Sequence, residues 1–306
     1  MTPTEASCLG TSLDCELEEE RWFAHRGWSV VLDSGPLPDE RFSHIVSLDD
    51  DTLTIEVAHP GHFVLTFFDL AKFHISSPDK VIRVFCLSLE VTEETLRHLL
   101  NDQVLPRIFA SDGALVLHAG SVLTPEGAVI LVGSSGRGKS TLAASLHVQG
   151  HSLLGDDAIL VSTSAAGVEC EATYRSLRLF PDSIASVLTA PVRIAPGAHY
   201  TSKLSVLDLG AEGYRGAQVA VRAIFILGEP SEQQILVRRM DPSDACMSLM
   251  EQSFSLDPSD VRHAQTRLDN ASKVATRIPV FDIRYPRDYS RIASVHEAIF
   301  GALRAI

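Results

Sequence analysis

The chain has 306 residues, with 39 acidic and 26 basic side chains and a formal net charge of −13. An apolar fraction of 45% and a charged fraction of 21% are ordinary globular values and argue against long disorder. The acidic balance excludes a general nucleic-acid or anionic-membrane binder, because phosphate contacts require a positive surface. This length permits one large domain or two smaller ones.

The chain begins with a polar, acidic stretch over residues 1–20, which predicts a flexible tail without the apolar region of a signal peptide. No apolar run reaches the length of a membrane-spanning helix. The five cysteines form no C-x-x-C pair, which excludes a zinc ribbon and argues against a disulfide framework. We therefore expect a cytoplasmic protein that has no membrane partner and keeps its thiols buried or idle.

Residues 21–111 predict a small β-rich N-terminal domain that ends in helical segments. Short β-rich runs alternate with turn formers such as 33–36 and 59–62, which predicts an antiparallel β unit. Thr92, followed by Glu93 and Glu94, is typical of a helix N-terminus, so a helix is expected over 91–100 and a second one over 104–110. The expected strands are 28–32, 52–57, 62–68 and 81–86.

Residues 112–306 predict a larger α/β domain. Apolar strands at 114–118 and 128–132 lead into a glycine-rich loop at 133–138 and a helix at 139–149. A further strand and an acidic pair follow, and this order predicts a βαβ-type core with helices covering the strands. The remaining expected elements are strands at 219–226, 234–237 and 279–285, and helices at 243–253, at 258–271 and from about 288.

The glycine-rich loop reads Gly-Ser-Ser-Gly-Arg-Gly-Lys-Ser over 133–140 and satisfies the pattern G-x-x-x-x-G-K-[ST]. Glycines let backbone N–H groups converge on phosphate oxygens, while the helix N-terminus adds a favourable dipole. Lys139 would bridge the β- and γ-phosphates of ATP, and the Ser140 hydroxyl would hold Mg²⁺. The alternative to phosphate binding is a glycine turn with a purely structural role. The expected phosphate-binding residues are Gly133, Ser134, Ser135, Gly136, Arg137, Gly138, Lys139, Ser140 and Thr141.

Two acids and a histidine flank this loop. Asp156 and Asp157 follow an apolar run, and the carboxyl ends of strands are where ligands bind in open α/β sheets. One carboxylate can hold a metal while the other accepts a proton from an attacking hydroxyl. The alternative is a solvated turn. His118 closes the expected strand at 114–118. The alternative to a functional role is a structural one, in which the histidine is only packed and hydrogen-bonded.

These three elements together resemble the kinase core of bacterial HPr kinase/phosphorylase and its relatives. That family has a histidine on the strand before a G-x-x-G-x-G-K-S loop and a G-H-x-x-x-x-D-D segment after the helix. Here His118 precedes the loop and Gly150-His151-Ser-Leu-Leu-Gly-Asp156-Asp157 follows the helix. The resemblance covers residues 112–185 and implies a P-loop kinase fold that is shared with phosphoenolpyruvate carboxykinase.

By this resemblance, Asp156 would be the general base, His118 would tune it, and Asp157 would support the metal. The family's metal-associated glutamate has no counterpart in 174–182, and its Arg-rich phosphorylase segment is absent, so the chain looks like the stand-alone branch of the family. Lys203 and Arg178 are weaker candidates for contacts with phosphate or substrate, and an exposed lysine is the alternative for Lys203.

The sequence therefore predicts an α/β P-loop kinase with a small N-terminal β-rich domain. It would use Mg–ATP to phosphorylate a hydroxyl, first of all a serine of a peptide or small protein, including a ribosomal peptide precursor. A small-molecule alcohol is the second hypothesis for the acceptor. A non-catalytic, ATP-binding regulator is the third. The resemblance also leaves a homo-oligomer open, because relatives of this core form hexamers.

Overall fold

A computed structural model describes residues 27–33, 35, 44–48, 52–174, 176–198, 200–207, 218–231 and 233–306. The expected tail at 1–20 lies outside these residues. The chain divides into two compact units, Met1–Val91 and Thr92–Ile306. Across the described residues, no helix combines the length and apolar character that would let it cross a membrane.

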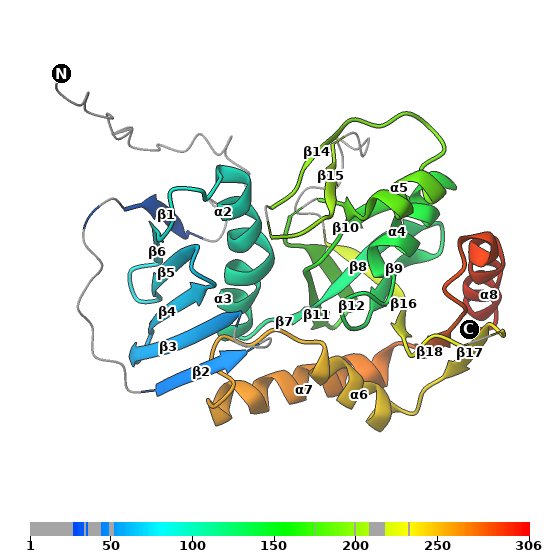
Figure 1. Cartoon of the computed structure of the whole chain (residues 1–306). Helices are drawn as coiled ribbons and strands as arrows, with labels where there is room; N and C mark the ends of the chain where they lie inside the picture. The colour runs from blue at the N-terminus through cyan, green and yellow to red at the C-terminus, as the bar shows by residue number, and fades with distance from the viewer. Residues whose placement is uncertain are drawn as a thin grey trace, which may run out of the picture. The chain divides into compact units, whose positions relative to one another are not determined.

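The first unit is built on a six-stranded sheet in the order β1-β6-β5-β4-β3-β2 (Figure 1). Neighbouring strands are antiparallel except β1 and β6, which pair in parallel, so the expected purely antiparallel unit needs this correction. β2 and β5 were not expected, although Phe73 and Ile75 are buried on one face of β5. The strands are β1 (Ser29–Leu32), β2 (His44–Leu48), β3 (Leu53–His59), β4 (His62–Phe67), β5 (Ala71–Ser76) and β6 (Val81–Cys86).

The helical segment after β6 belongs to the second unit, whereas the sequence placed the domain boundary near residue 112. Thr92 caps α2 (Glu93–Leu99) by accepting a hydrogen bond from the Thr95 backbone N–H. One π-helical turn, η1 (Leu100–Val104), joins α2 to α3 (Leu105–Ser111). The boundary moves because α3 packs on elements that follow it along the chain.

A mixed sheet of nine strands forms the centre of the described second unit, in the order β10-β8-β9-β16-β12-β11-β7, and β18 pairs with β16 while β17 pairs with β18. The loop-bearing strand β9 has one parallel neighbour, β16, which lies far along the chain, and one antiparallel neighbour, β8. β10, the strand after α4, pairs antiparallel with β8 at the edge. Because β9 and β10 are both antiparallel to β8, they run parallel to each other, so β9, α4 and β10 form the βαβ-type unit expected from the sequence, with β8 between the two strands.

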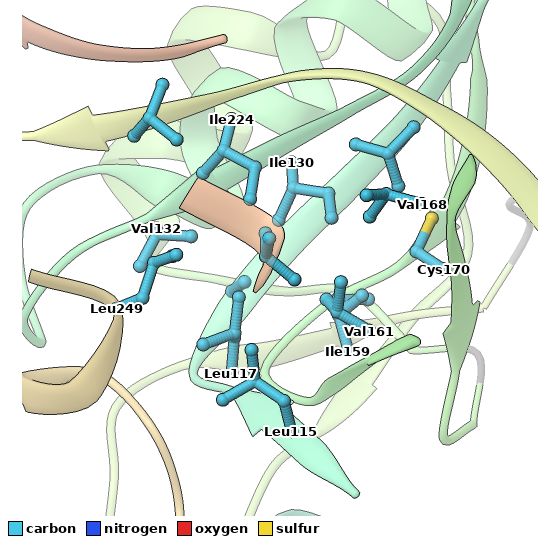
Figure 2. Close-up of a cluster of buried hydrophobic side chains, with 14 of the residues drawn as sticks. Leu115, Leu117, Ile130, Val132, Ile159, Val161, Val168, Cys170, Ile224 and Leu249 are labelled. Atoms are coloured by element: carbon cyan, nitrogen blue, oxygen red, sulfur yellow. The ribbon is translucent and has the colours of Figure 1, made fainter. Parts of the chain in front are cut away.

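Both faces of this sheet are covered, which explains why β9 is apolar at every position after its first glycine. Ile130 and Val132 face a core that includes Leu249 of α6, and Figure 2 shows these residues together. Val129 and Leu131 face the opposite core, which includes residues of α4 and α8. In Figure 1, α4 lies on one side of β8 and β9, and α6 and α7 lie on the other. The glycine loop therefore leaves the sheet from a strand fixed by packing on both sides.

The other elements complete the two layers around this sheet. The strands are β7 (Leu115–Leu117), β8 (Ala119–Thr124), β9 (Gly127–Val132), β10 (Ser152–Gly155), β11 (Ile159–Ser164), β12 (Gly167–Ala172), β16 (Val219–Leu227), β17 (Leu236–Arg239) and β18 (Val280–Arg284). A separate three-stranded sheet holds β13 (Arg178–Leu179), β15 (Leu204–Val206) and β14 (Ile194–Pro196). The helices are α4 (Lys139–Val148), α5 (Pro181–Val187), α6 (Pro242–Glu251), α7 (Val261–Arg277), η2 (Tyr289–Arg291) and α8 (Ile292–Arg304).

Candidate active site

The segment 133–138, called the glycine loop below, joins the end of β9 to the first residue of α4. Gly136 and Gly138 have φ angles of 75° and 94°, in the left-handed region that only glycine adopts freely. A Cβ on Gly138 would lie 3.2 Å from the Tyr285 hydroxyl, whereas one on Gly136 would meet nothing within 4 Å. The backbone at Gly136 therefore borders open space, as a cradle for a ligand requires.

Lys139 is the first residue of α4 and is buried beside the loop. Its Nζ donates to the Gly133 carbonyl at 2.7 Å and to the Ser134 carbonyl at 3.2 Å. Burial lowers the pKa of Lys139 to about 8, and the charges of Asp156 and Asp157 oppose that shift. The ammonium thus keeps its charge at neutral pH. Within the described residues its hydrogen bonds go to loop carbonyls, which a phosphate oxygen could replace.

Asp156 follows β10 and is fully buried. Neither carboxyl oxygen has a hydrogen-bond partner in the described part of the chain. A Cβ on Gly120 would lie 3.1 Å from Asp156 Oδ1, so glycine at that position leaves room for the carboxyl group. Burial raises the pKa of Asp156 to about 7, and the charge of Asp157 acts in the same direction. The side chain is poised to exchange a proton near neutral pH.

Asp157 occupies the left-handed region with a φ of 68°, which is uncommon for a residue other than glycine. Its Oδ2 accepts a hydrogen bond from Arg178 Nη2 at 2.5 Å. The same guanidinium contacts Asp102 and His98, and His98 Nδ1 lies 2.7 Å from Asp102 Oδ2. Burial raises the pKa of Asp102 to about 7 and lowers that of Arg178 to about 10.

His118 lies between β7 and β8, just beyond the strand that it was expected to close. Its Nδ1 is 3.2 Å from the backbone carbonyl of Asp157, and its ring stands edge-on to Phe254. Burial, assisted by the charge of Lys139, lowers the pKa of His118 to about 4. The imidazole is therefore neutral at physiological pH and contacts the acidic pair through the backbone.

A cavity of about 660 Å³ opens over the loop, which is within the range of small-molecule sites. It gathers most of the residues that the sequence singled out: residues 135–141, His118, Asp157, Arg178 and Lys203. Gly133, Ser134 and Asp156 do not line it, and Asp156 lies beneath its wall. Lys203 Nζ is 5.6 Å from the centre of the Phe180 ring.

The oxygen donors at this wall fit a hard divalent cation. Within the described residues, no three or more His, Cys, Asp or Glu side chains are grouped to hold a metal by themselves. Magnesium ordinarily binds through one or two carboxylates together with substrate phosphates, so a dedicated cage is not required. Ser140 and Asp157 line the cavity, and the buried Asp156 carboxyl oxygens have no hydrogen-bond partner in the part of the chain that the structure describes.

Sequence reasoning missed several residues of the cavity wall. Asp102 is the most informative, since it stands three residues from both Leu99 and Leu105, which are buried. An acid on an apolar helical face signals a buried charge, and that signal was available. Tyr285 and Tyr289 offered no comparable signal because they flank a strand and a helix distant in sequence. The other missed lining residues are His98, Gln103, Leu179, Phe180, Asp182, Ser183, Tyr200, Thr201, Pro286, Arg287, Asp288, Ile292 and Val295, together with Leu142 at the start of α4.

No protein-family model matches the chain, and no curated protein matches it. Among solved structures, the chain is similar to the Hpr(Ser) kinase/phosphatase from Coxiella burnetii. That match has 14% identity and a TM-score of 0.32, and it covers 62% of this chain and 97% of the other. It is a distant similarity of fold between mixed α/β proteins, and similarity at this level says nothing about activity.

Proposed function

We propose that the chain is an ATP-dependent phosphotransferase that moves the γ-phosphoryl group of Mg–ATP to a hydroxyl, namely a serine of a peptide or small protein. The observation that carries this proposal is the G-x-x-x-x-G-K-S loop between β9 and α4, which opens on a cavity of about 660 Å³. The loop supplies backbone N–H groups and Lys139, and the cavity provides space for a nucleotide and an acceptor.

The chain's own groups divide the work of phosphoryl transfer. The amides of the glycine loop would bind the phosphates, and Lys139 would exchange its carbonyl partners for phosphate oxygens. Ser140 and Asp157 would hold magnesium, with support from Asp156, and the ion would neutralise the charge of the phosphates. Lys203 lines the same cavity and would add positive charge near the transferring group.

Asp156 is the proposed proton acceptor. As the acceptor oxygen forms its bond to the γ-phosphorus, its proton passes to the Asp156 carboxylate and the bond to the β-phosphate oxygen breaks, releasing ADP. A pKa of about 7 suits this role, because an effective base works best near the ambient pH. Asp156 lies beneath the cavity wall, and catalytic hydrogen bonds often tighten only in the complex with substrate. His118 supports the pair by contacting the Asp157 carbonyl.

Two substitutions separate binding from chemistry. Lys139→Ala should lose both ATP affinity, by at least about tenfold, and turnover, because a buried charge-assisted contact is worth about 1.5–3 kcal/mol. Asp156→Asn should retain ATP binding within about threefold and lose turnover by about 10²-fold or more. Isothermal titration with ATP, and label transfer from γ-labelled ATP, measure the two quantities. Lys273→Ala, at an exposed position of α7, is the matched lysine control.

The acceptor is identified by where the label goes. Serine-containing peptides and a metabolite extract are incubated with γ-labelled ATP, and mass spectrometry locates the phosphate. Label on a peptide serine supports the proposal, and label on a metabolite would replace the peptide by a small-molecule alcohol. ATP binding without any transfer would overturn the kinase assignment and leave a nucleotide-binding regulator. Normal turnover by Asp156→Asn would refute its role as the proton acceptor.

A further inference from the structure

A buried ionic network lies at the cavity wall and extends into the helices that precede the sheet. It consists of Asp157 after β10, Arg178 at the start of β13, Asp102 in the π-helical turn η1, and His98 in α2. Asp102 is 2% exposed, Arg178 5% and Asp157 7%. Charges at this depth are retained only when they are paired, and here two carboxylates share one guanidinium.

The sharing is through a single nitrogen. Arg178 Nη2 donates to Asp157 Oδ2 at 2.5 Å and also to Asp102 Oδ2. Breaking the bond to Asp157 would therefore leave Arg178 anchored on Asp102 by the same atom. Asp102 can accept more, since its Oδ1 has no hydrogen-bond partner among the described residues. The network is built so that Arg178 can leave one acid without losing the other.

This inference rests on the proposed function. We propose that Arg178 is an internal counter-ion of Asp157 and gives up this carboxylate to the divalent cation. Asp102 is the positioning residue that then holds Arg178. A carboxylate bonded to a guanidinium offers fewer lone pairs to a metal, and a cation beside Asp157 repels Arg178. The affinity of the site for the cation is then set by a competition between the cation and Arg178 for one carboxylate.

The backbone keeps Asp157 in place while its partner changes. Its left-handed φ of 68° lies in a tight turn in which the Ala158 N–H donates to the Asp156 carbonyl at 2.9 Å. β10 precedes this turn and β11 follows it, so the backbone of Asp157 is held between two strands of the sheet. Arg178 neutralises the acid, while the turn fixes the backbone from which the carboxylate extends.

This competition predicts effects of opposite sign for two substitutions in one network. Asp102→Asn leaves Arg178 with Asp157 as its only carboxylate, so the cation should bind about tenfold more weakly. Arg178→Gln removes the competitor, so the cation should bind about tenfold more tightly. The probe is Mn²⁺ titrated into the full chain with saturating ADP, with free Mn²⁺ followed by electron paramagnetic resonance. A network that serves only to stabilise the fold predicts weakening, or no change, for both variants.

Two matched controls test whether net charge alone moves the affinity. Asp182→Asn makes the same charge change at an acid that lines the cavity and accepts from the Tyr289 hydroxyl at 2.9 Å. Arg97→Gln makes the same charge change as Arg178→Gln at an arginine of α2 that pairs with Glu93 and does not line the cavity. Both controls should change Mn²⁺ affinity by less than about threefold. Controls as large as the test variants would overturn the counter-ion role.

The outcomes also separate this inference from the function on which it rests. ADP affinity without metal is measured first, by calorimetry on the wild-type chain. Absence of ADP binding would refute the nucleotide site and, with it, the counter-ion. ADP binding with unchanged Mn²⁺ affinity in Asp102→Asn or Arg178→Gln would refute the counter-ion alone. If circular dichroism shows that one variant does not fold, the direction in which the other variant changes the Mn²⁺ affinity decides.

Discussion

Replacing His296 should reduce the acid sensitivity of the second unit. His296 lies in α8, is 3% exposed, and places Nε2 2.7 Å from the Ser145 hydroxyl of α4. Its Nδ1 has no hydrogen-bond partner among the described residues. Burial lowers the pKa of His296 from 6.5 to about 4, and the neighbouring His151 acts in the same direction. Protonation is therefore much easier after unfolding than before it.

The sign and size of the effect follow from these two values. Because the pKa in the folded chain is the lower one, the stabilisation is complete above pH 6.5 and is lost as the pH falls toward 4. Between pH 7.5 and pH 5 this single group should remove about 2 kcal/mol from the free energy of unfolding. The full loss, below pH 4, is about 3 kcal/mol.

Urea unfolding followed by far-UV circular dichroism at pH 7.5, 6.5, 5.5 and 5 measures this dependence. His296→Gln keeps a polar side chain but does not titrate, so its loss of stability between pH 7.5 and 5 should be about 2 kcal/mol smaller than that of the wild type. His147→Gln, at the end of α4, controls for the substitution itself. Equal pH dependence in His296→Gln and the wild type would refute the argument.

Two further predictions test the packing around the site. Gly155→Ala should lower the free energy of unfolding by about 1–3 kcal/mol, because its Cβ would lie 2.4 Å from the Ala172 Cβ, directly before the acidic pair. Gly301→Ala, in α8, should instead raise the free energy of unfolding by about 0.5–1 kcal/mol, because a Cβ there would meet nothing within 4 Å. Equal effects of the two alanine variants in urea unfolding would contradict the packing argument. Thr92→Ala should lower the free energy of unfolding by about 1 kcal/mol because it removes the cap of α2, and thermal melts would detect this loss. Thr92→Ser should retain the cap. An equal loss of stability in both variants would exclude the capping role.

Local patterns in the sequence were sufficient for the parts of the site that lie close together along the chain. The apolar run 128–132, the glycine loop and the helix after it correspond to β9, the loop and α4. The acidic pair follows a strand as expected, because strand and turn propensities act over a few residues. Nothing in these short-range patterns identifies which strands become neighbours in the sheet. The return of β10 to the edge of the sheet was therefore missed.

By itself, the sequence determined a strand, a glycine loop with a lysine, a helix, and two acids at a strand end. Only the tertiary structure decided what the acids meet. It buried Asp156 with no hydrogen-bond partner for its carboxyl oxygens among the described residues, paired Asp157 with Arg178, and brought Asp102 to the same guanidinium from a segment that the sequence assigned to the N-terminal domain. The physical reason is that hydrogen bonds and burial join residues far apart along the chain, whereas composition and periodicity describe only neighbours.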